Sequence, residues 1–172
     1  IISANLLLIR KNDDPLWQEV KLNKIGKEWI GNYVIKNKNT ILILLKFVAG
    51  SKTDDNDKNL WDVIIYGNDN KPLPSSLGYR GMMYAQGDKY EFSPFGFYKK
   101  KNMEKAKSDF ENESKFYPNA WRGEITLWNI WMEENPGEQT NNKIRLAIDE
   151  LYEKNKKDDE AIWEFYLLYE KL

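Results

Sequence analysis

The amino-acid sequence predicts an α+β fold, in which an N-terminal antiparallel β-sandwich is followed by a C-terminal segment of helical hairpins. Short runs rich in Ile, Val, Leu, Trp and Tyr recur through residues 1–74 at intervals of about 8–12 residues, as in a sandwich. Apolar residues recur at helical spacing through residues 102–172. A chain of 172 residues with 41% hydrophobic residues is long and apolar enough to bury a core.

Five strands are expected in the N-terminal part, each bounded by polar or turn-forming residues. In the third strand, alternation places Trp29 and Tyr33 on one face and Ile30 and Val34 on the other. Gly31 would leave room there for a neighbouring ring or mark a bulge. The expected strands span residues 4–10, 18–22, 28–35, 40–48 and 60–66.

Four helices are expected in residues 102–172. Pro118 ends the first, and Asn119 is the expected N-cap of the second. The second helix stops at Asn135-Pro136-Gly137, and the acidic residues from Asp158 suit the positive end of the fourth helix. The short connections between these helices predict sequential antiparallel packing.

A connecting segment, residues 75–101, lies between the two parts. Ser75 and Ser76 could cap a short helix that runs through Tyr84. Residues 87–101 are expected to form a loop, and the basic run from Lys99 to Lys101 is interpreted as a solvated part of it.

The chain contains neither histidine nor cysteine. This excludes Ser-His-Asp and Cys-His catalysis, thiolate and imidazole metal ligands, and disulfides. A net charge of −1 gives no electrostatic basis for binding nucleic acid, and the longest apolar run, from Ile41 to Leu45, is too short to span a bilayer. We therefore expect that this chain is not itself an enzyme, binds no nucleic acid and contains no membrane span.

The acidic stretch from Thr53 to Asn59 lies between two expected strands. Asp55, Asp57 and Asn59 alternate as at the start of a calcium loop, where Ca²⁺ takes hard oxygen ligands. However, Leu60 occupies the position at which an EF-hand needs glycine. A solvated turn, in which Asx side chains bond to their own backbone, is therefore favoured. No cofactor is expected, and Ca²⁺ at these residues is the alternative.

Aromatic residues suggest two candidate binding surfaces. Trp17, Trp29 and Trp61 lie on expected strands, and if exposed together they would form a stacking platform for sugar rings. Burial in the core is the commoner fate of tryptophan. In the helical part, core packing between helices is the leading interpretation of the many aromatic residues. Any surplus beyond what four short helices can hide would be exposed and would mark a protein-docking surface. The candidates for docking are Trp128, Trp131, Trp163 and Tyr166.

Any remaining chemistry would rest on carboxylates, Lys, Ser, Thr or Tyr, and paired carboxylates could in principle supply an acid and a base. The pairs are Glu133-Glu134, Asp149-Glu150 and the acids from Asp158 to Glu160. Adjacent residues on a helix diverge by about 100°, so these acids are expected to lie on solvated helix faces.

The features of the N-terminal part occur in a recognisable order. They are a strand containing Trp17, then Gly26-Lys27-Glu28-Trp29 with Tyr33, Lys46-Phe47-Val48, Asp54-Asp55-Asn56-Asp57, Trp61-Asp62-Val63-Ile64-Ile65-Tyr66, and Lys71-Pro72-Leu73-Pro74. This order resembles the N-terminal region of TlpA-like thiol-disulfide oxidoreductases of the Bacteroidetes type. In that family an immunoglobulin-like β-domain precedes helical hairpins resembling tetratricopeptide repeats, and a thioredoxin-fold domain with Cys-x-x-Cys comes last. Here Phe116-Tyr117-Pro118-Asn119-Ala120 is similar to the inter-repeat turn.

The chain departs from the family in having no Cys-x-x-Cys. The resemblance therefore implies an accessory region without its catalytic domain, in a periplasmic or cell-surface protein. Residues 1–74 would be the immunoglobulin-like sandwich, and residues 102–172 a four-helix, repeat-like segment. The implied partner is another protein or the missing C-terminal thioredoxin-like domain. The strand pattern also resembles glycan-binding β-sandwich modules, which keeps carbohydrate binding as the alternative function. Because the chain begins with Ile1 and has no charged-then-apolar leader, we expect a fragment or a mature form.

Overall fold

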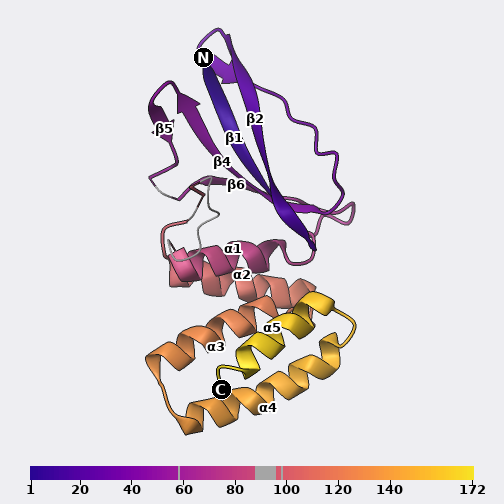
Figure 1. Cartoon of the computed structure of the whole chain (residues 1–172). Helices are drawn as coiled ribbons and strands as arrows, with labels where there is room; N and C mark the ends of the chain where they lie inside the picture. Colours follow the sequence, from indigo (N-terminus) through magenta and orange to yellow (C-terminus); the bar gives the residue numbers. More distant parts are fainter. Residues whose placement is uncertain (58, 88–95, 98) are drawn as a thin grey trace.

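The α+β class is confirmed by the computed structural model, in which an antiparallel sheet is followed by helices (Figure 1). The structure describes residues 1–57, 59–87, 96–97 and 99–172. Lys58 of the acidic stretch, and residues 88–95 and 98 of the predicted loop, lie outside the described residues. In Figure 1 the sheet stands end-on above α1 and α2, and the other helices lie farther away from it.

The described strands form one six-stranded sheet. They are β1 (Ile2–Arg10), β2 (Asp13–Ile25), β3 (Glu28–Ile30), β4 (Thr40–Ala49), β5 (Lys52–Asp54) and β6 (Trp61–Ile64). The order is β3-β2-β1-β4, and β5 and β6 both pair with β4. Every pairing is antiparallel. A sandwich needs two sheets packed face to face, so the immunoglobulin-like arrangement is not confirmed by these strands.

The strands differ from the predictions most clearly in the start of β2, the end of β3 and the presence of β5. The turn between β1 and β2 consists of Lys11 and Asn12, and Asn12 adopts a left-handed φ of 61°. Residues Asp13 to Pro15, which were expected to lie before the second strand, therefore belong to β2. β3 ends at Ile30 instead of residue 35. Strand β5 was not predicted, because its polar residues 52–54 resemble a turn.

Gly31 marks the point where the chain leaves the edge of the sheet. A Cβ atom on Gly31 would lie 2.5 Å from Leu22 Cδ2 and 3.2 Å from the Lys21 carbonyl oxygen, so only glycine fits this approach to β2. Residues 31–39, here called the crossing segment, form no strand and bring Tyr33 against the sheet. Tyr33 therefore packs against the apolar side chains of the sheet from a coil, and not from the predicted strand.

The two faces of the sheet have different surroundings. Leu7 pairs with Leu44, and this helix-side face packs against Met83 of α1 and against Phe97. The opposite face, here called the open face, is apolar along most of its length and packs against the crossing segment. It is formed by Leu16, Val20, Leu22, Ala4, Leu6, Leu8, Ile43, Leu45, Phe47, Trp61 and Val63.

All of the predicted helices are present. They are α1 (Ser76–Gln86), α2 (Met103–Phe116), α3 (Arg122–Glu134), α4 (Glu138–Asn155) and α5 (Asp159–Tyr169). The prediction that Asn119 caps α3 is wrong: Trp121 occupies the N-cap position and gives no side-chain cap bond. The Asp158 side chain does cap α5, accepting a hydrogen bond from Ala161 N at 3.2 Å. None of the described helices has the length and apolar character needed to cross a membrane.

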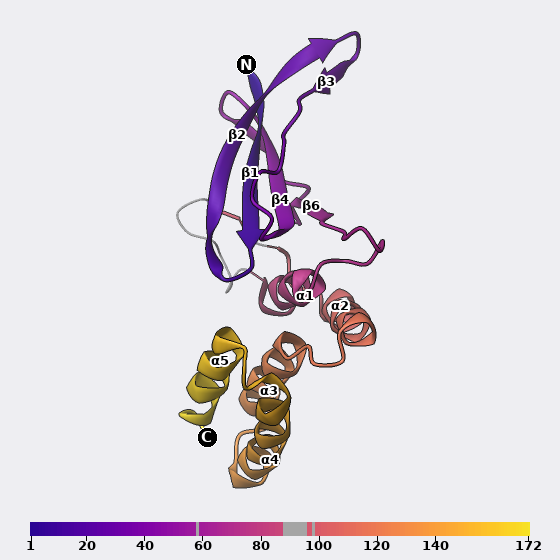
Figure 2. The same ribbon diagram turned by 90° about the vertical axis from the view of Figure 1, so that its right-hand side faces the viewer.

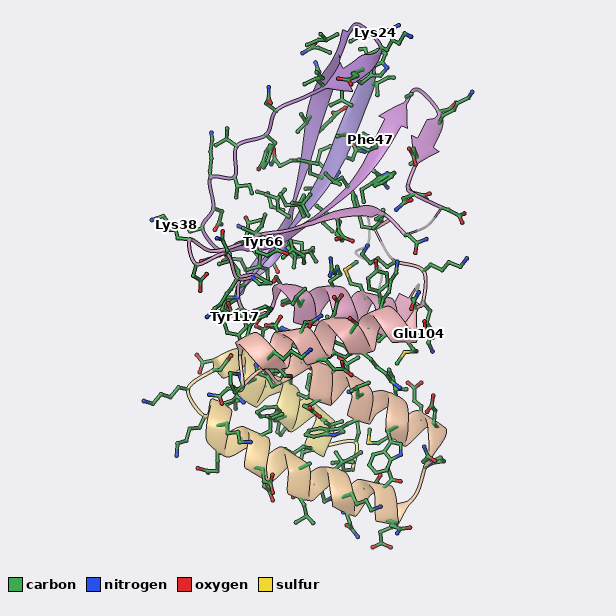
Figure 3. All side chains as sticks on the ribbon, turned by 180° about the vertical axis from the view of Figure 1, so that it is seen from behind. Lys24, Lys38, Phe47, Tyr66, Glu104 and Tyr117 are labelled. Carbon is green, nitrogen blue, oxygen red and sulfur yellow. The ribbon has the colours of Figure 1, made fainter. Side chains whose placement is uncertain are left out.

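The first turn of α1 is capped by a side chain from α2. The Glu113 carboxylate, 4% exposed, accepts hydrogen bonds from the backbone N–H groups of Ser75 (2.6 Å), Leu77 (3.0 Å) and Gly78 (3.1 Å). These donors have no partner within the helix. Nearby, the Tyr117 hydroxyl donates to the Pro72 carbonyl oxygen at 2.6 Å, and Figure 3 shows Tyr117 where the sheet meets the helices. The end of α2 thus joins the two parts of the molecule.

Two glycines allow α1, α2 and α3 to approach closely around the Phe110 ring. A Cβ atom on Gly81 would lie 2.5 Å from Phe110 Cε1, and one on Gly123 would lie 2.8 Å from Phe110 Cγ. The ring is 6% exposed and therefore has little room to move. The glycines fix the spacing of these helices.

Replacing Gly81 by alanine is expected to lower the free energy of unfolding by roughly 1–2 kcal/mol. Overpacking costs about 1–3 kcal/mol, and the better helix propensity of alanine returns up to about 1 kcal/mol. Urea unfolding of the variant against the wild type measures this change. The double variant Gly81→Ala with Phe110→Leu is the control, and it should lose less than the two single changes together. A more stable Gly81→Ala variant would contradict the close packing.

Candidate functional site

The helix α5 has apolar residues on both of its sides. Its inner side chains, Ala161, Phe165 and Leu168, are buried against α3 and α4. Phe165 meets the Trp121 ring edge-on, with ring centroids 6.0 Å apart. Figure 2 shows α5 at one side of the helical part, beside α3 and α4.

The outer side of α5 presents four large apolar side chains to solvent. Trp163 is 59% exposed, Tyr166 52%, Tyr169 48% and Leu167 38%. The rings of Trp163 and Tyr166 stack with centroids 5.8 Å apart and an angle of 28° between their planes. We call these four residues the α5 aromatic surface. A helix with apolar residues on all sides is normally buried, but this side of α5 is exposed to solvent.

The first turn of α5 is fixed to α1 and α3 through Arg122. The Arg122 guanidinium lies 4.1 Å from the ring centroids of both Tyr79 and Trp121 and forms an ion pair with Glu160. The Tyr79 hydroxyl donates to Glu160 Oε1 at 3.0 Å. Trp121 Nε1 donates to Asp158 Oδ2 at 3.3 Å, so the residue that caps α5 is itself held.

The other end of α5 is also held. Asn141 Nδ2 donates to the Leu172 carbonyl oxygen at 3.1 Å, and Arg145 donates to the same oxygen. Lys171 Nζ donates to Asn129 Oδ1 at 3.0 Å. Because both ends are fixed, the α5 aromatic surface is a preorganised one, which lowers the entropic cost of binding.

The predicted docking residues divide into two pairs. Trp163 and Tyr166 lie together on the outer side of α5. Trp128 and Trp131 lie on α3, where they are partly buried against the helical core. The sequence argument missed Leu167 and did not include Tyr169 among the docking candidates, although the apolar composition of both sides of α5 could have indicated them.

The three candidate sugar-binding tryptophans do not form one platform. Trp17 pairs with Leu7 and lies on the helix-side face, whereas Trp61 pairs with Leu45 on the open face. Trp29 pairs with Lys24, on the same side of β2 as the open face. Trp29 and Trp61 are separated by four strand spacings of about 4.8 Å, or roughly 19 Å. Alternation along β2 is the reason that Trp17 points away from the other two.

The acidic stretch forms a turn closed by its own hydrogen bonds. Asn56 N donates to Asp54 Oδ1 at 3.0 Å, and Leu60 N donates to the Asp55 carbonyl oxygen at 2.7 Å. Asn56 and Asp57 adopt left-handed φ values of 56° and 53°. The Asn59 carbonyl oxygen accepts a hydrogen bond from Lys99 Nζ at 2.7 Å, so an ammonium group stands beside this stretch. Among the described residues, no group of three or more His, Cys, Asp or Glu could hold a metal ion. These hydrogen bonds support the interpretation of the acidic stretch as a turn over that of a calcium loop.

A buried charge cluster joins β6 to α1, α2 and Lys99. Lys99 Nζ donates to Asp62 Oδ2 at 2.7 Å, and Arg80 Nη1 donates to Asp62 Oδ1 at 3.0 Å. Arg80 also makes two hydrogen bonds to Asp109, at 2.8 and 2.7 Å. The prediction that Lys99 is solvated is wrong, because its side chain is 0% exposed. Although burial alone would raise the pKa of Asp62, the charges of Lys99 and Arg80 bring it below its usual value. Opposite charges are paired throughout, which is typical of a structural cluster.

Two of the carboxylate pairs are exposed to solvent, as predicted, and the acids at the start of α5 make structural contacts. Glu133, Glu134, Asp149 and Glu150 are exposed. Asp158 and Glu160 make the contacts that fix the first turn of α5.

No protein-family model, curated protein or solved structure matches the chain.

Proposed function

We propose that this chain is a non-catalytic interaction module that binds a protein partner through the α5 aromatic surface. The observation that carries the proposal is the exposure of Trp163, Tyr166, Leu167 and Tyr169 on a helix fixed at both ends. Trp and Tyr are enriched among the residues that contribute most to binding energy, and rigid presentation increases their effect. Exposed apolar patches of this kind mark protein-interaction sites.

The finer architecture belongs to the same proposal. We take the N-terminal part as an immunoglobulin-like β-domain and the helices as hairpins resembling tetratricopeptide repeats, in an exported periplasmic or cell-surface protein. Helical repeat arrays need a polar outer face on their terminal helix. The outer side of α5 is apolar instead, which supports a further helix or a thioredoxin-like domain as the partner that covers it.

The proposal is tested by photo-crosslinking in the cells that produce the protein. A benzophenone amino acid replaces Tyr166, and in a matched control it replaces Tyr152 of α4, which is 41% exposed. One defined adduct is expected from position 166 and none from position 152. Adding Trp163→Ala and Leu167→Ala should reduce the adduct at least about tenfold, because central aromatic contacts dominate binding energy.

Two results would overturn the proposal. One is equal adduct formation from positions 166 and 152, which would indicate random collision. The other is an adduct at position 166 that persists when Trp163 and Leu167 are replaced, since the proposed surface would then be absent. Mass spectrometry of a specific adduct identifies the partner and shows whether it is a helical segment.

A further inference from the structure

The open face of the sheet contains a groove, separate from the α5 aromatic surface. It has a volume of about 370 Å³, which lies within the range of about 300–1,000 Å³ found for small-molecule sites. The sheet forms its floor, and the chain from Trp29 to Ile35 forms one wall. The floor residues are Ala4, Leu6, Val20, Leu22, Ile43, Leu45 and Phe47, and the wall residues are Trp29, Ile30, Gly31, Tyr33 and Ile35. Figure 3 shows Phe47 on the sheet in this region.

The lining determines which chemistry the groove can accept. Among the described residues that line it, none has a charged side chain, and the polar side-chain groups are the Trp29 indole N–H and the Tyr33 hydroxyl. A sugar placed there would leave most of its hydroxyl groups without hydrogen-bond partners, which is costly. A hydrocarbon chain loses no hydrogen bonds on entering. The lining therefore favours hydrocarbon.

The crossing segment determines the shape of the occupant. Two sheets that pack face to face lie about 10 Å apart, with interdigitated side chains. The crossing segment already occupies that layer, because Gly31 presses against Leu22 and Tyr33 packs on the open face. The remaining space suits a narrow chain better than the sheet of a second copy.

Lysines lie at the end of the groove nearest the β2–β3 turn. Lys24 pairs with Trp29, and Lys52 pairs with Ala49 on the open face. Both lysines are exposed, and Figure 3 shows Lys24 at the end of the sheet farthest from the helices. Asp54 is an acid near this end of the open face; it pairs with Phe47 and accepts the hydrogen bond from Asn56 N. The local excess of positive charge is complementary to an anionic head group.

We propose that this groove binds a fatty acid anion, with the hydrocarbon tail between the sheet and the crossing segment and the carboxylate near Lys24. The ligand binds as a single molecule and not as part of a membrane.

Binding is measured by calorimetry and by Trp fluorescence with octanoate, decanoate and dodecanoate below their micelle concentrations. Affinity should rise up to about fourfold for each added methylene until the groove is filled. Ile35→Glu should weaken binding at least about tenfold, because it places a charge against the tail. The control is Val34→Glu, which makes the same change at a neighbouring position that is 73% exposed and outside the groove lining, and it should have no effect.

The head group is tested separately. Lys24→Glu should weaken decanoate binding but not decanol binding, whereas Lys21→Glu, on the helix-side face, should change neither. If Ile35→Glu fails to fold, Trp29→Ala replaces it, with Trp17→Ala as the control on the opposite face. The proposal is overturned if no fatty acid binds, if Val34→Glu and Ile35→Glu weaken binding equally, or if only vesicles or oligosaccharides bind. It is also overturned if Ile35→Glu converts a dimer into a monomer, since a second copy would then cover the groove.

Discussion

Replacing Asp62 by alanine is expected to lower the free energy of unfolding by about 3–5 kcal/mol. The reason is that Lys99, 0% exposed, would lose its carboxylate partner and keep only the Asn59 carbonyl oxygen as a described acceptor. Breaking a buried ion pair on one side leaves the other charge uncompensated. Guanidinium unfolding of the variant against the wild type measures the loss.

Two further variants separate this effect from an ordinary loss of contacts. Lys99→Met should cost less than Asp62→Ala, because it removes the buried charge and leaves Asp62 paired with Arg80. Asp69→Ala removes an exposed carboxylate 3.8 Å from Lys71 and should cost at most about 1 kcal/mol. Equal losses for Asp62→Ala and Asp69→Ala would show that the buried cluster has no special role.

Replacing Glu113 by alanine should lower the free energy of unfolding by roughly 2–4 kcal/mol, because a buried donor without an acceptor costs about 1–3 kcal/mol. Three N–H groups at the start of α1 lose their acceptor in this variant. Glu113→Gln keeps one acceptor oxygen and should lose less. Glu111→Ala, at an exposed position of the same helix, is the control and should have little effect. A Glu113→Ala variant as stable as Glu111→Ala would contradict the proposed capping.

Glu113 also gives a prediction for the dependence of stability on pH. Burial raises the pKa of Glu113 above its usual value of 4.5, outweighing its backbone hydrogen bonds and the charge of Arg122. The folded state therefore holds this proton more tightly than the unfolded state. The stability that Glu113 contributes is fully present below pH 4.5 and is lost as the pH rises through the folded-state pKa. The stability of the wild type relative to Glu113→Gln should decrease as the pH rises above 4.5, and an increase would contradict the raised pKa.

Local signals predicted the helices well, and they failed where distant residues decide the structure. Pro118 and Asn135-Pro136-Gly137 mark helix ends that the structure confirms. The alternation in residues 28–35 resembles a strand, but regular pairing with β2 ends at Ile30. Whether strands form one sheet or two depends on pairing between distant segments, which no local pattern contains.

For the candidate sites too, local sequence signals fail where contacts between distant residues decide the outcome. The aromatic surplus included Trp163 and Tyr166, which are exposed, but composition could not separate them from Trp128 and Trp131, which are partly buried. That distinction depends on how the helices pack against one another. The burial of Lys99 was missed because its partners Asn59 and Asp62 lie 40 and 37 residues earlier in the chain.

The capping of α1 by Glu113 has a consequence for synthesis on the ribosome. The carboxylate is made 38 residues after Ser75, which at about 5–20 residues per second is a delay of roughly 2–8 s. During that interval the sheet has already been made, while α1 still lacks the acceptor for its first amide groups. Surfaces left uncovered at this stage are prone to aggregate. The synthesis of α2 supplies this acceptor and also the Phe110 ring that packs against Gly81 of α1.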